Sequence, residues 1–272
     1  MSHQIKSLKE DRISGLPEPV IHHIMSLLPW EDVTRTGSLS KTWHSLWSTY
    51  PNLEFDQTVL ERTWPDTLSN YEKWNLLLMS VNQSLQRLEE RSVSIHRFKL
   101  HATIEDQHLL RFAVERVLRS NVREIDLAHY DMENQHYKYK MPQCLYSAKE
   151  VKRLKLTGFE VGQIVDLLSG CPSMEEFDLE WCKTFKDVKF SSDKLLKFHV
   201  QLQLRDGLNN IELDACNLQS FGYHGSFGIE LLWATMWMIG SEQSRAASAM
   251  DCDGGDGGDD GGFAAATTVA AD

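Results

Sequence analysis

A short apolar pattern recurs through the middle of this chain and restricts its fold more than any other feature. In each copy, an apolar residue is followed by two others, a second apolar residue, one other and a third apolar residue. The first copy is Ile95, Phe98 and Leu100, and the last is Leu218, Phe221 and Tyr223. The copies between them begin at Val122, Val151, Met174 and Leu195. Successive copies start 21 to 29 residues apart, which is typical of a solenoid with one short parallel strand and one return segment per repeat. We therefore predict an α/β fold with a short, irregular solenoid of about six parallel rungs.

The residues between the apolar positions carry charges whose sign alternates from rung to rung. The basic residues at these positions are Arg97, Lys99, Arg153, Lys155, Lys197 and His199. The acidic residues are Glu124, Asp126, Glu176, Asp178 and Glu180. Neighbouring parallel strands lie about 4.8 Å apart, so opposite charges on adjacent rungs can pair. We favour this pairing. Because an exposed pair is worth only about 0 to 1 kcal/mol, a second interpretation stays open, in which Arg153 and Lys155 bind an acidic segment of another protein.

Three short helical patterns precede the repeats, between Leu16 and Trp47. The first has Pro17 and Pro19 in its opening turn, where no intrahelical hydrogen bond is lost, and it stops at Pro29. The second spans residues 31–36, and the third begins after Ser40, a typical N-cap residue. Domains below about 40 residues rarely bury enough apolar surface alone, so we expect these helices to bind another protein.

The same segment, Asp11 to Asp56, resembles an F-box, the motif by which adaptor subunits dock onto the Skp-type linker of cullin-based ubiquitin ligases. The resemblance rests on Leu16-Pro17, Ile24 with Leu27-Leu28-Pro29, Leu39-Ser40-Lys41 with Trp43, and Leu46-Trp47. Later stretches, such as Leu167 to Pro172 and Ile211 to Phe221, resemble the divergent repeats of plant F-box/leucine-rich-repeat proteins. The resemblance implies the following linker-binding residues: Leu16, Pro17, Ile21, Ile24, Leu28, Pro29, Val33, Leu39 and Trp43.

We divide the chain into five parts on these grounds. Residues 1–10 form a flexible N-terminus, 11–52 the F-box, 53–92 a helical linker or cap, 93–228 the leucine-rich-repeat domain and 229–272 a divergent tail. An amphipathic helix is expected over Tyr71 to Glu90 within the linker. The tail is rich in Gly, Asp and Ala and contributes much of the net charge of −11. Such a composition buries too little to offset chain entropy, so we predict that the tail is mostly disordered.

Other features exclude several classes of protein. The acidic balance, without a cluster of Lys and Arg, argues against a nucleic-acid partner. The N-terminus lacks the apolar segment of a signal peptide, and no apolar run reaches the roughly 20 residues of a membrane span, so we expect a location in the cytoplasm or nucleus. The five widely spaced cysteines suit a reducing compartment. The histidines and cysteines lack metal-ligand spacing and no catalytic motif occurs, so we expect no metal, no cofactor and no catalytic residue.

The resemblance implies a non-catalytic function. The F-box would bind the Skp-type linker, and through it a cullin, while the repeats hold a target protein near a ubiquitin-loaded enzyme. The outward-facing basic residues, Arg97, Lys99, Arg153, Lys155, Lys197 and His199, are the candidate target-binding residues. The main alternative is a truncated F-box protein that binds the linker without a working target surface. An enzyme that uses the scattered Cys and His residues is the least favoured interpretation.

Overall fold

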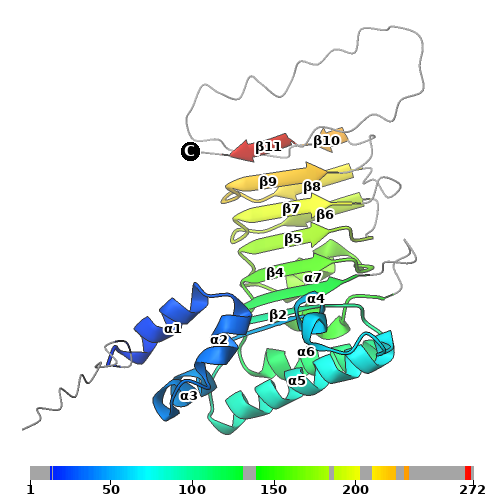
Figure 1. The fold of residues 1–272 in the computed structure, drawn as a ribbon. Coiled ribbons are helices and arrows are strands. Elements are labelled where there is room, and N and C mark those ends of the chain that lie inside the picture. The colour runs from blue at the N-terminus through cyan, green and yellow to red at the C-terminus, as the bar shows by residue number, and fades with distance from the viewer. Residues whose placement is uncertain are drawn as a thin grey trace, which may run out of the picture.

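The computed structural model describes residues 13, 15–130, 139–183, 187–202, 210–224, 230–232 and 267–270. Strands from successive repeats lie one above another in a single stack, and the N-terminal helices stand beside the β1 and β2 end of that stack (Figure 1). This arrangement confirms the predicted α/β solenoid. Within the described residues, no helix has both the length and the apolar character needed to cross a membrane.

The N-terminal unit consists of three short helices. They are α1 (Glu18–Ser26), α2 (Trp30–Thr36) and α3 (Lys41–Ser48). Pro17 and Pro29 directly precede the first two helices, where a residue without an N–H group costs no hydrogen bond. The Ser40 side chain accepts a hydrogen bond of 3.2 Å from the Trp43 backbone N–H and so caps α3. The unit has a small core of its own, formed by Ile21, Met25, Val33 and Tyr50.

The main sheet contains seven parallel strands among the residues that the structure describes. They are β1 (Asn52–Asp56), β2 (Arg97–Ala102), β3 (Glu124–His129), β4 (Arg153–Thr157), β5 (Glu176–Glu180), β7 (Lys197–Gln201) and β9 (Ser220–His224). Six of them are the predicted rungs. The seventh, β1, lies at the boundary between the predicted F-box and the predicted linker, and Leu53 and Phe55 pair in register with Phe98 and Leu100.

Every parallel pair of this sheet keeps the same register, so equivalent repeat positions form continuous rows. The middle apolar position of each repeat forms one buried row: Leu53, Phe98, Ile125, Leu154, Phe177, Phe198 and Phe221. Within this row the rings of Phe177 and Phe198 stack with centroids 5.7 Å apart. The charged positions alternate with these and therefore share the opposite face of the sheet.

Return segments cover the apolar face of the main sheet. The longest are α5 (Asn70–Glu90) and α6 (Gln107–Arg119), followed by η2 (Gln143–Ser147) and α7 (Ile164–Gly170). Helix α5 matches the helix expected over 71–90 and begins with a capping box between Ser69 and Glu72. Its buried residues, among them Trp74, Leu77 and Leu85, join the strand side chains in one continuous core. Two short elements, α4 (Gln57–Leu60) and η1 (Glu61–Thr63), follow β1.

Strands replace helices in the last return segments. A second parallel sheet contains β6 (Asp187–Ser191), β8 (Asn210–Asp214) and β10 (Glu230–Leu232). Strand β11 (Thr267–Ala270) pairs antiparallel with β9 at the end of the main sheet. Thus β10 and β11 lie in the range 229–272 for which a mostly disordered tail is predicted. The rest of that range, like residues 1–10, lies outside the described residues.

Candidate partner-binding surfaces

The three N-terminal helices leave a group of apolar side chains exposed at their surface. Leu16 is 39% exposed, Leu28 is 40% exposed and Leu39 is 67% exposed, and Pro17 and Pro29 are exposed as well. These five are predicted linker-binding residues. Large exposed apolar side chains in one small unit are typical of a surface that binds another protein.

Four further predicted linker-binding residues are less accessible. Ile21 and Val33 are 0% and 1% exposed and belong to the core of the three helices, so their assignment to a partner surface is corrected here. Ile24 and Trp43 are half-buried. The reason is geometric, because an apolar stripe on a helix of nine residues must serve both the helix's own domain and any partner.

Two further exposed apolar residues were not among the predicted linker contacts. Val20 is 44% exposed and Leu27 is 72% exposed. The Leu27-Leu28-Pro29 sequence contained a signal for this, since two consecutive residues at a helix end cannot both point into the same core. We call the exposed group Leu16, Pro17, Val20, Leu27, Leu28, Pro29 and Leu39 the apolar edge of the F-box segment.

The charged face of the main sheet is the second surface of interest. The register places Arg97, Glu124, Arg153, Glu176 and Lys197 in one row and Glu54, Lys99, Asp126, Lys155, Asp178 and His199 in the next. Both rows alternate in sign. We call these two rows, together with Asp56, His101 and Glu180, the charged strand face.

Each of the six candidate target-binding residues lies within ion-pair distance of a carboxylate. Arg97 and Lys99 reach Glu54 at 3.6 and 4.0 Å. The other pairs are Arg153 with Glu124 and with Glu176 (3.5 Å), Lys155 with Glu180 (2.6 Å), Lys197 with Glu176 (3.0 Å) and His199 with Asp178 (3.0 Å). The predicted pairing between adjacent rungs is therefore confirmed. A role of these residues in target binding stays a prediction.

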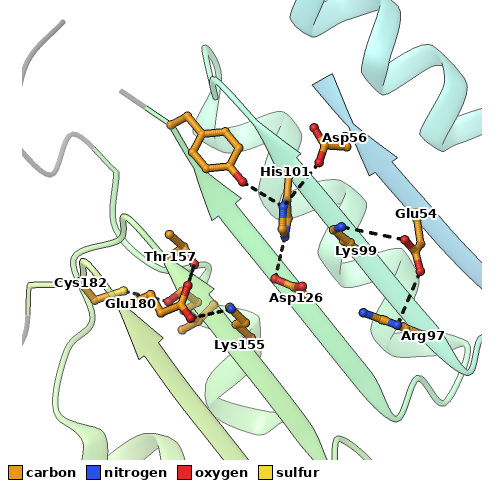
Figure 2. A network of polar contacts seen from close by, with 12 residues as sticks. Glu54, Asp56, Arg97, Lys99, His101, Asp126, Lys155, Thr157, Glu180 and Cys182 are labelled. Atoms are coloured by element: carbon orange, nitrogen blue, oxygen red, sulfur yellow. Dashed lines mark hydrogen bonds and ion pairs between the residues drawn. The ribbon is translucent and has the colours of Figure 1, made fainter. Parts of the chain in front are cut away.

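The His101 side chain on β2 contacts residues from β1, from β3 and from the chain just after β3 (Figure 2). Its Nε2 lies 2.8 Å from an Asp126 carboxylate oxygen, and its Nδ1 lies 3.0 Å from the Tyr130 hydroxyl. Asp56 approaches the same ring at 3.9 Å. If the Nε2–H group donates to Asp126, the Nδ1 atom of a neutral ring can accept from Tyr130. The sequence does not predict the approach of Asp56 to His101, because β1, which carries Asp56, is not among the predicted rungs.

Partial burial changes the ionisation of two residues at the centre of this face. Burial raises the pKa of the Asp178 carboxyl, and the positive charges of His199 and Lys155 only partly oppose this. Burial disfavours the charged form of Lys155, but the hydrogen bond and charge of Glu180 outweigh that effect and raise the Lys155 pKa. Lys155 therefore remains charged at neutral pH and tied to Glu180.

Three of the cysteines that the structure describes have raised pKa values. Cys144, Cys171, Cys182 and Cys216 are free thiols. Burial raises the pKa to about 11 at Cys144 and Cys171 and to about 12 at Cys182, so these three stay protonated at neutral pH. Over the described part of the chain, no group of three or more His, Cys, Asp and Glu side chains is arranged to hold a metal ion.

Comparison with known proteins finds relatives that combine an F-box with leucine-rich repeats. Residues 13–55 match the F-box domain family. A putative F-box/LRR-repeat protein of Arabidopsis thaliana is 28% identical over 197 residues, which are 66% of this chain and 40% of the relative. A putative F-box/FBD/LRR-repeat protein of the same plant is 33% identical over 62% of this chain and 41% of the relative. F-box/LRR-repeat protein 25 is 25% identical over 66% of this chain and 72% of its own length.

The chain thus spans about two fifths of the length of the first two of these relatives. No solved structure matches it significantly. The fold and its apolar edge define the class: an F-box unit followed by a solenoid of parallel strands. These matches show that the chain carries an F-box domain and is similar to F-box/LRR-repeat proteins of Arabidopsis, in agreement with the resemblance seen in the sequence.

Proposed function

We propose that this protein is a non-catalytic, substrate-recognition adaptor of a Skp–cullin–F-box ubiquitin ligase, acting in the cytoplasm or nucleus. The apolar edge of the F-box segment would bind the Skp-type linker, and the linker would connect the chain to a cullin. The observation that carries this proposal is that apolar edge: its leucines are exposed although the three helices have a separate core.

Such an adaptor would act by bringing its target close to the enzyme that carries ubiquitin. Holding a target beside a ubiquitin-loaded enzyme turns an encounter between two molecules into a reaction within one complex, which raises the effective concentration of the target lysines. No side chain of the adaptor needs to take part in bond formation. The protonated thiols of Cys144, Cys171 and Cys182 agree with this role.

A second candidate function is binding to the linker without a working target surface. It is supported by the charged strand face, whose six candidate target-binding residues already have carboxylate partners. Such a chain would occupy the linker and compete with other adaptors. Exposed pairs of this kind are weak, however, so a target could displace them.

Two measurements test these proposals in sequence. The purified full chain is first mixed with a purified Skp-type linker, and a stable complex on gel filtration is expected for both functions. Proteins captured by the complex are then offered to a reconstituted ligase with a cullin, a ubiquitin-conjugating enzyme and ubiquitin. Ubiquitin transfer to a captured protein supports the adaptor, whereas linker binding without any transfer supports the competitor. Failure to bind the linker contradicts both.

A further inference from the structure

A cavity of about 530 Å³ is lined by residues that belong neither to the apolar edge nor to the charged strand face. Its walls are the first turns of α6, the segment around η2 and the chain that follows β4 and β5. This volume falls in the range of about 300 to 1,000 Å³ that is common for ligand pockets.

A short ladder just beyond the strand ends forms one wall of the cavity. The backbone of Glu160 forms a parallel β-bridge with Lys140 on one side and with Lys183 on the other. The backbone N–H of Met141 donates to the Glu160 carbonyl at 3.0 Å, and that of Val161 donates to the Lys183 carbonyl at 2.7 Å. The Gln107 side chain donates to the Lys140 carbonyl at 2.8 Å and so ties α6 to the ladder. Lys140 and Lys183 are therefore held at fixed backbone positions on either side of Glu160.

The cavity combines an apolar floor with a basic rim. Met141, Pro142 and Val161 are buried, whereas Arg111, Lys140 and Lys183 are exposed. This division matches a ligand with an apolar part that enters and a negative charge that stays near the opening.

The basic groups at this rim differ from those of the charged strand face in their pairing. In the described part of the chain, neither Lys140 nor Lys183 forms an ion pair, and Arg111 lies 3.5 Å from Glu115 on its own helix. Glu160 is the single acidic side chain among the described residues that line the cavity. The cavity thus has an excess of positive charge, although the whole chain carries −11.

We propose that this cavity, rather than the charged strand face, receives a segment of the target protein in which an acidic residue stands next to an apolar one. The inference rests on the proposed adaptor function and specifies the site and chemistry of target recognition. The apolar side chain would lie over Met141 and Val161, and the carboxylate would lie between Lys140 and Lys183. A small free anion would leave the apolar floor unfilled, which is why a peptide segment is the better occupant.

The test uses the full chain and two pools of fluorescein-labelled octapeptides in a fluorescence polarisation assay. In one pool the central residue is Glu, and in the other it is Gln. In both pools the next residue is Leu, and all other positions carry neutral residues. We expect the Glu pool to bind at least ten-fold more tightly than the Gln pool. The preference should shrink as salt rises, because the rim charges are exposed to screening.

Three variants locate the binding. Lys140→Glu combined with Lys183→Glu should abolish the preference for the Glu pool. Lys149→Glu combined with Lys194→Glu makes the same change in net charge at exposed lysines outside the cavity lining, and should leave the preference intact. Glu160→Gln removes the acid between the two lysines and should tighten binding of the Glu pool several-fold. Thermal melts of all three confirm that they remain folded.

The contrary outcomes are distinct. Equal binding of the two pools, or equal losses in the two double-lysine variants, would overturn the inference. Displacement of the peptides by N-acetylglutamate amide as effectively as by unlabelled peptide would show a small-anion site instead. Linker capture is measured on the same preparations. Capture without a peptide preference contradicts this inference alone, and a peptide preference without capture contradicts the adaptor function alone.

Discussion

Arg87 on α5 and Trp47 on α3 join the F-box unit to the solenoid through two contacts at once. The guanidinium carbon lies 3.8 Å from the centre of the Trp47 ring, and Nη1 donates to the Trp47 backbone carbonyl at 2.9 Å. Burial lowers the Arg87 pKa to about 10, so the group still carries its charge at neutral pH. A half-buried cation–π contact together with a charged hydrogen bond is a strong connection for its size.

Replacing Arg87 should therefore destabilise the protein. We expect Arg87→Met, which keeps the apolar stem, to cost about 1 to 3 kcal/mol through the lost charged hydrogen bond and ring contact. Thermal or urea unfolding measures the loss. Arg91→Met is the matched control, since Arg91 is exposed one turn further along the chain, and it should have little effect. Equal stability of the two variants would show that the junction contributes nothing.

The apolar edge should dominate binding to a Skp-type linker. A few central apolar residues usually carry most of the energy of an interface. Leu16→Ala combined with Pro17→Ala should therefore weaken linker binding by at least ten-fold in a calorimetric titration while the melting temperature stays close to wild type. Leu109→Ala combined with Phe112→Ala removes comparably exposed apolar surface from α6 and should bind normally. A folded Leu16 and Pro17 variant with wild-type affinity would exclude the apolar edge as the docking site.

The charged strand face should respond to reversal of its central basic residues. Arg153→Glu places a like charge beside Glu124 and Glu176, which is unfavourable on neighbouring strands. Lys155→Glu does the same beside Asp126 and Asp178. We expect a lower melting temperature at low salt and partial recovery at high salt, because screening acts over about 10 Å at 0.1 M. Arg153→Gln with Lys155→Gln removes the same ion pairs without adding like charges, so it should cost less than the double reversal. A loss of stability independent of salt would mean that packing, and not charge, is responsible.

Asp178 should give the protein a measurable pH dependence. Because burial raises its folded pKa, the folded state holds a proton more tightly than the unfolded chain does, whose Asp titrates near 3.9. Stability should therefore fall as pH rises from about 3.9 through the raised pKa, and Asp178→Asn should lack this part of the profile. The difference between wild-type and variant melting curves across pH 3 to 7 measures it. If the variant instead becomes less stable relative to wild type as pH rises, the ion pair with His199 outweighs the cost of burying Asp178.

Much of the solenoid is readable from the sequence, because the repeat is both a pattern and a register. Once Phe98 and Ile125 occupy equivalent positions, the neighbours of Lys99 and Asp126 follow. Strand β1 was missed although Tyr50, Leu53 and Phe55 have the same spacing as the other repeats. These three residues stand 45 residues before Ile95, with a long helix between, so the regular period does not reach them.

The sites were less predictable than the strands. Periodicity places Ile21 and Leu27 on one helical stripe, but only packing decides that the first is buried and the second exposed. The cavity draws on residues from 107 to 183, and their meeting depends on a ladder at the strand ends that has no apolar repeat of its own. Local sequence pattern carries no signal for such a convergence.

The alternation of charge along the strand stack limits how this solenoid can change in length. Removing the single repeat that carries Arg153 and Lys155 would bring Glu124 beside Glu176 and Asp126 beside Asp178. Inserting one repeat of either sign would create a similar clash. Removing or adding two consecutive repeats preserves the order of signs. The natural unit for growth, loss or engineered extension of this protein is therefore a dipolar pair of rungs, even though its apolar core repeats with every single one.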